Sequence, residues 1–560
     1  MTLSKPLAGR SASGLFILAI ATLILGPVVH LIGSATMPAG AFSLGLAYDV
    51  LANADTVQAL INTIIYVVGV SLISVAVGTP LAFLTERTDI SPLAKRVIRL
   101  SIISSLITPA FLVAMAYVNL LGPNAGLVNT ALRGLFGLAA DRGPLNVYNM
   151  AGVLFLGALQ SVAFVYLVTA AAFSKMNPEL EEAAAISGVG RARIIATVTL
   201  PVAKGSIFAG GMLAMAGALA DYGTPHMVNF TVLTLRIRSY MIEANFAAAS
   251  VVSLLLVLLS LAVLAIYRRT EARNSVATVT GKSFAPRPFP LGRARHALAA
   301  IAYIYAFLAV VLPLVGLGLT SLLDRLGGGI SLDNFTIRHY RDIVFGDALV
   351  VRAVTNSVIL SVGTAIVCAV LSVFAAYIIV RRRSSLLDYI VVIPLGLAGT
   401  ALAVALVMTV TGFPLRSLGL YGTLWILLLA YIIRHLPLAV RPAHAGLSQI
   451  APELEEASRL SGASWGRTLY SIILPLLRPS LTAACIIVFL TTLTELSASI
   501  IVRHIGTDTI ATAIMDLWDG GGGYQRASAV AICVFAVMML IVVIAQSLSS
   551  KSLFGQQETA

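Results

Sequence analysis

Two acidic residues in this sequence each follow a long apolar stretch. Asp221 comes directly after SIFAGGMLAMAGALA, and Glu495 comes after LTAACIIVFLTTLT, 274 positions later. A carboxylate among apolar residues is costly unless it is paired, so both are candidate functional residues. With Tyr222 beside Asp221, the pair offers oxygen ligands of the kind that hard cations prefer. The alternative is that each acid caps nearby backbone or serine groups, or pairs with one of the arginines Arg236, Arg238 and Arg503.

The same separation relates two polar segments that are rich in glutamate. Residues 178–201 read PELEEAAAISGVGRARIIATVTLP and residues 452–475 read PELEEASRLSGASWGRTLYSIILP, so 11 of 24 positions are identical without a gap. A simple polar connector would not need to repeat its prolines, acids and glycine in this way. We therefore interpret the segments as two copies of one working part.

Each segment is predicted to begin with a short helix of two to three turns. In the first copy, Asn177 is a suitable N-cap, Pro178 fits the first helical position, and the glutamates favour the positive end of the helix. A glycine in the left-handed conformation is predicted to end each helix. The closing Pro201 or Pro475 is predicted to mark the turn into the next apolar run. The candidate contact residues are Glu181, Glu182, Ala183, Ala184 and Gly188 in the first copy, and Glu455, Glu456, Ala457 and Gly462 in the second.

The elements that must position these residues are predicted to be membrane-spanning helices. The chain is 58% hydrophobic and 11% charged, whereas about a quarter of the residues of a soluble protein are charged. The first apolar run, residues 14–32, is longer than the core of a signal peptide and is interpreted as an uncleaved span. Runs of about 20 apolar residues predict twelve spans, centred near Leu25, Val70, Ile107, Leu159, Met212, Leu256, Val310, Thr364, Ala401, Leu428, Ile487 and Val537.

The spans are predicted to form two parallel six-helix halves. A basic stretch broken by prolines, residues 268–296, is interpreted as a cytoplasmic linker between residues 1–267 and 297–560. Asn62–Arg87 aligns with Asn356–Arg381, and an even number of spans separates equivalent points. Such parallel repeats predict a pathway along a pseudo-twofold axis between the halves.

The basic residues predict the orientation of the chain. Cytoplasmic N- and C-termini place about 26 of the 37 Lys and Arg residues inside, as the positive-inside rule requires. The net charge of +13 is therefore explained by an anionic inner leaflet of the lipid bilayer, and no nucleic acid partner is expected.

The order Glu182-Ala183-Ala184, then Gly188, then Leu200-Pro201 resembles the EAA loop of permease subunits of ATP-binding-cassette (ABC) importers. The second copy has Glu456-Ala457-Ser458, with serine in place of the second alanine, followed by Gly462 and Leu474-Pro475. Two copies in one chain are similar to the fused permeases of the ferric-iron, thiamine and phosphonate uptake systems.

This resemblance implies an all-α integral membrane protein with the type I ABC importer permease fold, in the bacterial cytoplasmic (inner) membrane. It implies two copies of an ABC ATPase subunit docked on the repeated segments, and an extracytoplasmic solute-binding protein that delivers the cargo. In this family the short helix couples closure of the ATPase to the membrane helices.

The chain is not expected to be an enzyme or to bind a cofactor itself. Gly281-Lys282-Ser283 has the form of the end of a P-loop, but Val276 stands where that motif needs a glycine. ATP hydrolysis is therefore expected in a partner chain. No metal site is predicted, because Cys368, Cys485 and Cys533 lack the spacing of a metal or redox site.

Several alternatives stay open at this point. A secondary transporter of the major facilitator type also has six plus six spans. Its repeated signature lies between the second and third spans, whereas the repeated segments of this chain lie between the fourth and fifth predicted spans of each half. A membrane enzyme has no set of catalytic residues to support it. The fused architecture and the acid pair favour ferric iron as cargo, with 2-aminoethylphosphonate, thiamine or a polyamine as alternatives. The outer segment 122–149 is either a folded lip or a simple loop.

Overall fold

The computed structural model describes residues 7–37, 42–137, 143–274, 288–328, 330–520 and 523–548. These residues form helices and no β-sheet. Ten helical runs are long and apolar enough to cross a membrane. Their helices are α1 (Leu7–Thr36), α3 (Ala54–Arg87), α7 (Met150–Lys175), α9–η1–α10 (Arg191–Ala220), α13 (Phe246–Asn274), α14–η2–α15 (Ala294–Ser321), α17 (Ala348–Arg382), α20 (Leu424–Ser448), α22–η7–α23 (Trp465–Leu493) and α26 (Tyr524–Leu548).

Two of the twelve predicted spans are not single helices. The predicted span near Ile107 is α4 (Pro92–Ile107) followed by α5 (Ala110–Leu121), with a bend of 102°. The one near Ala401 is Ser385–Gly396, made of α18 and η5, followed by α19 (Gly399–Thr411), with a bend of 109°. Counting each bent pair as one span gives the predicted twelve.

Side chains at equivalent positions brace the two bends. The side-chain amide of Gln160 on α7 donates to the carbonyls of Ser105 and Thr108, at the end of α4. Arg434 on α20, 274 positions later, donates to the carbonyl of Leu397 at 3.4 Å. A broken helix in lipid leaves carbonyls without intrahelical partners, and these side chains supply partners for them.

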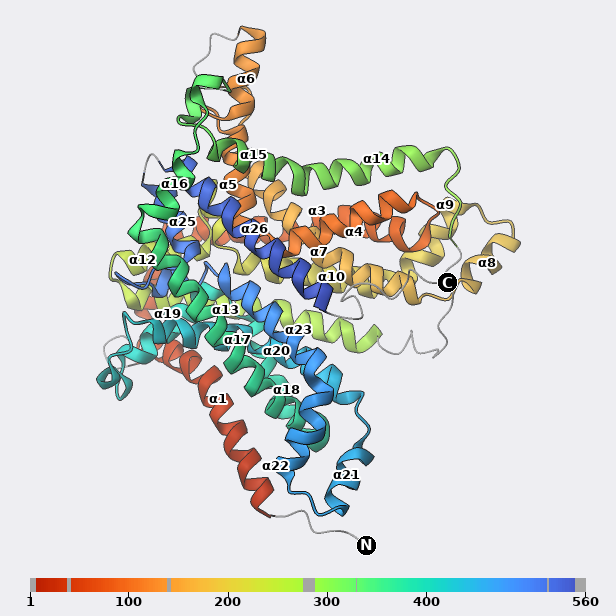
Figure 1. The fold of residues 1–560 in the computed structure, drawn as a ribbon, viewed down its shortest axis with the longest axis vertical. Helices are drawn as coiled ribbons and strands as arrows, with labels where there is room; N and C mark the ends of the chain where they lie inside the picture. Colours follow the sequence, from red (N-terminus) through yellow and green to blue (C-terminus); the bar gives the residue numbers. More distant parts are fainter. Residues whose placement is uncertain are drawn as a thin grey trace.

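The two halves interlock and then separate. Helix α1 packs against α18 and α19 of the other half, and α14 and α15 pack against α4 and α5. Figure 1 shows the helices converging on its left-hand side, around α12 (Leu233–Ile242), α19 and α25 (Ile510–Asp519). They diverge toward two short helices, α8 (Glu179–Ile186) and α21 (Pro452–Leu460), which lie far from each other.

The predicted linker begins later than expected, because α13 stays helical to Asn274. Residues 275–287, and with them Gly281-Lys282-Ser283, lie outside the described residues. After them, Phe289 accepts a backbone hydrogen bond from Asp89 and donates one to the carbonyl of Arg87. The end of the linker is therefore tied to the C-terminal end of α3.

The first outer segment, residues 122–149, is more than a simple loop, because it contains a short helix. Helix α6 (Leu127–Phe136) is fixed there because the Asn129 amide donates to the carbonyls of Leu121, Gly122 and Leu145. The second outer excursion is built from short helices, η3 (Leu326–Gly328), η4 (Leu332–Asn334) and α16 (Arg338–Phe345). The remaining short helices are α2 (Gly45–Ala52), α11 (Gly223–Met227), η6 (Leu415–Leu418) and α24 (Ser499–Val502).

Candidate functional site

The repeated segments form the two predicted short helices, α8 and α21. Asn177 accepts a hydrogen bond from the backbone N–H of Glu179 at 3.0 Å, but α8 begins at Glu179, so Pro178 rather than Asn177 lies at the N-cap position. Pro452 occupies the first turn of α21. Gly188 has φ of +78° and Gly462 has φ of +82°, so the predicted left-handed ends are confirmed. The local signals in the sequence thus set both ends of these helices.

The closing prolines are not turns, which corrects the sequence-based expectation. Pro201 and Pro475 lie inside continuous helical runs that begin at Arg191 and Trp465. Each follows a five-residue π-helical segment, η1 (Ile195–Thr199) or η7 (Leu469–Ile473). Because proline has no N–H to bond back along the helix, we attribute the wider turn before each proline to this missing bond.

The nine predicted contact residues differ in their exposure. Ala183, Gly188, Ala457 and Gly462 are exposed, and a Cβ added to either glycine would meet nothing within 4 Å. Glu456 is also exposed, and Glu182 and Ala184 are half-buried. Glu181 and Glu455, in contrast, are only 5% and 6% exposed. In each half, an exposed alanine and an exposed glycine therefore lie on the same short segment as one buried acid.

The buried acids are held by arginines at the end of α3 and α17. Glu181 forms an ion pair with Arg87, whose side chain is fully buried, and accepts from the Thr199 hydroxyl at 2.7 Å. Glu455 is paired with Arg381, with 2.7 Å between Nε and Oε1. Sequence reasoning missed these pairs. The available signal was that the repeat Asn62–Arg87 and Asn356–Arg381 ends on both arginines.

Asp221 and Glu495 lie where α10 and α23 end, and each caps the helix that follows. Asp221 accepts from the Tyr66 hydroxyl at 2.7 Å and from the backbone N–H of Thr224 at 3.1 Å. Glu495 accepts from the backbone N–H groups of Ala498 and Ser499 and lies 3.5 Å from Arg434. This geometry corresponds to the capping alternative, and the pathway role of the two acids stays a prediction.

The three arginines considered as partners of these acids bind elsewhere. Arg236 lies 3.7 Å from Asp55, and Arg503 forms a bidentate pair with Asp516. Arg238 donates to the Tyr222 hydroxyl and lies 4.0 Å from Asp519. Within the described parts of the chain, no three His, Cys, Asp or Glu side chains come close enough to hold a metal ion.

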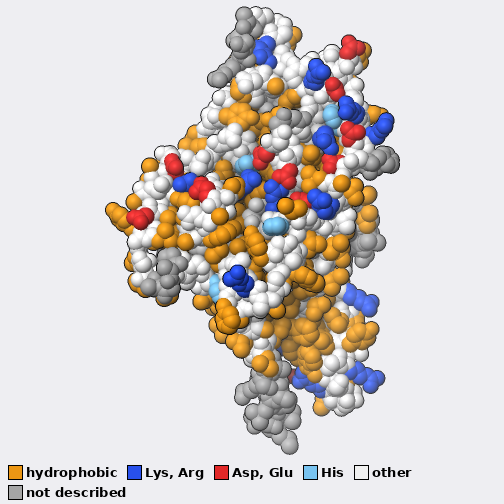
Figure 2. Space-filling view, turned by 90° about the vertical axis from the view of Figure 1, so that its left-hand side faces the viewer, with side chains coloured by type: hydrophobic (Ala, Val, Ile, Leu, Met, Phe, Trp, Pro, Cys, Tyr) orange, Lys and Arg blue, Asp and Glu red, His pale blue; other side chains and the backbone are white. Residues whose placement is uncertain are grey.

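The segments that carry the two acids are also where the halves touch. The Ser497 hydroxyl donates to the carbonyl of Ala220 at 3.1 Å, and Leu496 lies against Gly223. His226, stacked on Tyr222, meets Asp519 of α25 at 3.1 Å. We call residues 220–226, 495–498 and Asp519 the outer contact. Figure 2 shows the corresponding face of the molecule, where acidic, basic and histidine side chains are mixed.

The outer contact is predicted to weaken in acid. Partial burial alone would raise the pKa of Asp519, but the hydrogen bond from His226 and the charges of Arg238 and Arg503 outweigh it, so the pKa lies below its ordinary value. A carboxylate with a lowered pKa stabilises the folded protein above its ordinary pKa, and this is lost as the pH falls through the lowered value.

The melting temperature of the purified chain in detergent, followed from neutral pH downward, checks this. We expect wild type to lose more stability in the carboxylate range than the Asp519→Asn variant. Asp333→Asn, at an exposed position in the second outer excursion, should follow the wild-type curve. Parallel curves for wild type and Asp519→Asn would show that the ionised carboxylate does not hold this contact.

Comparison with known proteins agrees with the duplicated architecture. A family model described as "Binding-protein-dependent transport system inner membrane component" matches residues 78–276 and again residues 368–554. Each match contains one short helix and one acid of the pair.

Two of the relatives described here cover most of the chain, and a third covers less than half of it. The ferric transport system permease protein FbpB of Actinobacillus pleuropneumoniae is 24% identical over 94% of this chain and 76% of its own length. A Haemophilus influenzae protein named for ferric transport, FbpB 1, is 24% identical over 86% of this chain and 76% of its own length. A Salmonella paratyphi A protein named for 2-aminoethylphosphonate transport, PhnV, is 25% identical over 45% of this chain and 93% of its own length. The chain, with its two matched halves, belongs to the family of inner membrane components of binding-protein-dependent transport systems.

Proposed function

We propose that this chain supplies both halves of the membrane permease of an ABC importer that takes ferric iron from an extracytoplasmic binding protein. Two copies of a separate ATPase subunit drive it, one docked on α8 and one on α21. The observation that carries this proposal is the pair of short helices with matching open surfaces and matching buried acids. A single chain that serves two ATPases needs two such docking helices.

The arrangement of the halves supports alternating access. The halves touch at the outer contact and diverge toward α8 and α21 (Figure 1). With α8 and α21 on the cytoplasmic side, as proposed, this arrangement fits a state in which the halves are joined on the outer side and apart on the cytoplasmic side. ATPase closure would draw α8 and α21 together and open the outer contact, and hydrolysis would reverse the change. In this orientation both termini are cytoplasmic, and affinity for the cargo resides mostly in the binding protein.

Ferric iron is proposed as cargo on two grounds. The relatives that cover most of the chain are named for ferric transport, and Asp221 and Glu495 offer carboxylate oxygens beside the contact between the halves. 2-Aminoethylphosphonate is the second candidate, since PhnV matches nearly half of the chain and the outer excursion carries Arg325, Arg338, Arg341 and Arg352.

Uptake by proteoliposomes that contain the permease, its ATPase and the cargo-loaded binding protein tests the proposal. With ATP inside, we expect labelled iron to accumulate, vanadate to stop accumulation, and a proton uncoupler to leave it unchanged. Labelled 2-aminoethylphosphonate with its own binding protein serves as the second cargo. Accumulation of that compound and not of iron would identify 2-aminoethylphosphonate as the cargo. Uptake that resists vanadate and collapses with the uncoupler would identify a secondary transporter instead.

A further inference from the structure

Helices α3 and α17 are the longest in the described chain, with 34 and 35 residues, and they occupy equivalent places in the two halves. From Asn62 to Arg87, and from Asn356 to Arg381, each spans 25 residue steps without a break. At about 1.5 Å per residue, this length corresponds to roughly 38 Å. Each helix therefore reaches from the cytoplasmic side to the outer side of the membrane.

The cytoplasmic end of each helix binds the docking helix of its own half through an ion pair and a hydrogen bond. Besides the ion pairs with Glu181 and Glu455, the Arg381 guanidinium donates to the carbonyl of Ile450 at 2.8 Å, just before α21. Arg87 makes the equivalent bond to the carbonyl of Met176 at 3.5 Å, just before α8. Since the Arg87 side chain is fully buried and that of Glu181 nearly so, separating the two side chains would leave a buried charge without its partner. The two helices in each half should therefore move together.

The outer end of α3 binds the chain between α11 and α12. The Asn62 amide donates to the carbonyl of Thr231 at 2.8 Å, and the Thr63 hydroxyl accepts from the backbone N–H of Leu233 at 2.9 Å. One turn further in, Tyr66 donates to Asp221. The first half of the outer contact is thus attached directly to α3.

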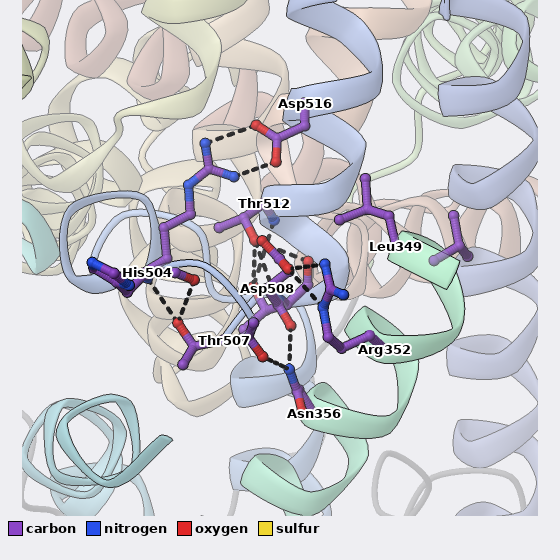
Figure 3. A network of polar contacts seen from close by, with 12 residues as sticks. Leu349, Arg352, Asn356, His504, Thr507, Asp508, Thr512 and Asp516 are labelled. Carbon is purple, nitrogen blue, oxygen red and sulfur yellow. Dashed lines mark hydrogen bonds and ion pairs between the residues drawn. The ribbon is translucent and has the colours of Figure 1, made fainter. Parts of the chain in front are cut away.

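The outer end of α17 repeats these contacts (Figure 3). The Asn356 amide donates to the carbonyls of Gly506 and Asp508 at 3.1 and 2.9 Å. The Ser357 hydroxyl accepts from the backbone N–H of Ile510 at 2.8 Å. Arg352 adds an ion pair with Asp508 at 2.8 Å. This segment leads into α25, which carries Asp519 of the outer contact.

We propose that α3 and α17 are coupling rods, in which Arg87 and Arg381 are positioning residues that pass the movement of α8 and α21 to the outer contact through Asn62 and Asn356. The inference rests on the proposed function, because an ATPase must move α8 and α21. It explains why the duplicated stretch begins on asparagine and ends on arginine in both halves: one residue holds the outer segment and the other holds the docking helix.

The test uses the full reconstituted complex and measures uptake and ATP hydrolysis in the same vesicles. In the Asn62→Ala/Asn356→Ala variant, we expect iron taken up per ATP to fall roughly tenfold, within the range typical of coupling between two sites, while hydrolysis stays within about twofold of wild type. These asparagines lie at the outer end of the rods, so the ATPase interface is unchanged. In the Arg87→Gln/Arg381→Gln variant, uptake per ATP should fall in the same way.

Two controls separate coupling from folding. Exchanging the charges in both halves, with Arg87→Glu, Glu181→Arg, Arg381→Glu and Glu455→Arg together, should restore part of the uptake per ATP. The exposed pair Arg441–Asp388 should tolerate Arg441→Gln without change. The proposal that α3 and α17 are coupling rods would be contradicted by wild-type uptake per ATP in the asparagine variant. Equal losses of uptake and hydrolysis in every variant would contradict it as well. A wild-type complex without coupled uptake would instead contradict the proposed function.

Discussion

Replacing Gly188 and Gly462 together with valine is expected to reduce uptake to background while the chain still inserts into the membrane. Both glycines have left-handed backbone, φ of +78° and +82°, which costs an L-residue roughly 1–2 kcal/mol and a β-branched one more. Space is not the obstacle within the chain, because an added Cβ meets nothing within 4 Å. The end of each docking helix should therefore shift, and the added side chains should obstruct an approaching ATPase. Uptake and ATP hydrolysis in proteoliposomes measure the effect.

The same loops offer matched controls. Gly190 and Gly466 also have open space around an added Cβ, but Gly190 has φ of −64° and Gly466 is not among the glycines with positive φ. Gly190→Val combined with Gly466→Val should therefore keep most of the uptake. If both double variants transport as wild type does, α8 and α21 are not docking helices.

Neutralising the acid pair is the second change with a large expected effect. The Asp221→Asn/Glu495→Gln variant keeps oxygen acceptors for the backbone N–H groups of Thr224, Ala498 and Ser499. The caps should therefore survive. If the carboxylates contact the cargo, uptake of iron should fall roughly tenfold or more, since one charge-assisted contact is worth about 1.5–3 kcal/mol. Uptake equal to wild type would show that the acids only cap helices.

Arg434 requires its own control, because Glu495→Gln leaves it without its carboxylate. Breaking a buried ion pair by removing one partner costs about 3–5 kcal/mol, whereas removing both charges is often neutral. Adding Arg434→Gln to the double variant should restore any loss of thermal stability. Uptake that recovers together with stability would assign the effect to the unpaired arginine, and uptake that stays low would assign it to the lost carboxylates.

Local signals explain the parts of the site that were predictable from the sequence. Asn177, Pro178 and Gly188 each act on backbone within a few residues, so the start and end of α8 follow from residue type alone. The capping of Thr224 by Asp221, three residues away, has a similarly local pattern. The sequence also allows a transport role, because an acid beside an apolar stretch fits both interpretations.

The missed features depend on contacts between distant residues. Hydropathy averaged over 20 residues cannot separate a straight span from a bent one, so the breaks after Ile107 and before Gly399 were predicted as continuous helices. Arg87 and Glu181 are 94 positions apart, and no periodicity relates them. Only the coincidence that both lie in duplicated stretches suggested a link, and that coincidence does not reveal which atoms meet.

Photo-cross-linking from the docking helices tests the central claim most directly. A benzoylphenylalanine residue replaces Ala183 in one variant and Ala457 in another, both at exposed positions of α8 and α21, and Ser331 in the outer excursion serves as the control. We expect illumination of membranes to join positions 183 and 457, but not position 331, to the ATPase subunit. Absence of any such product from both helices, in membranes that take up cargo, would contradict the account.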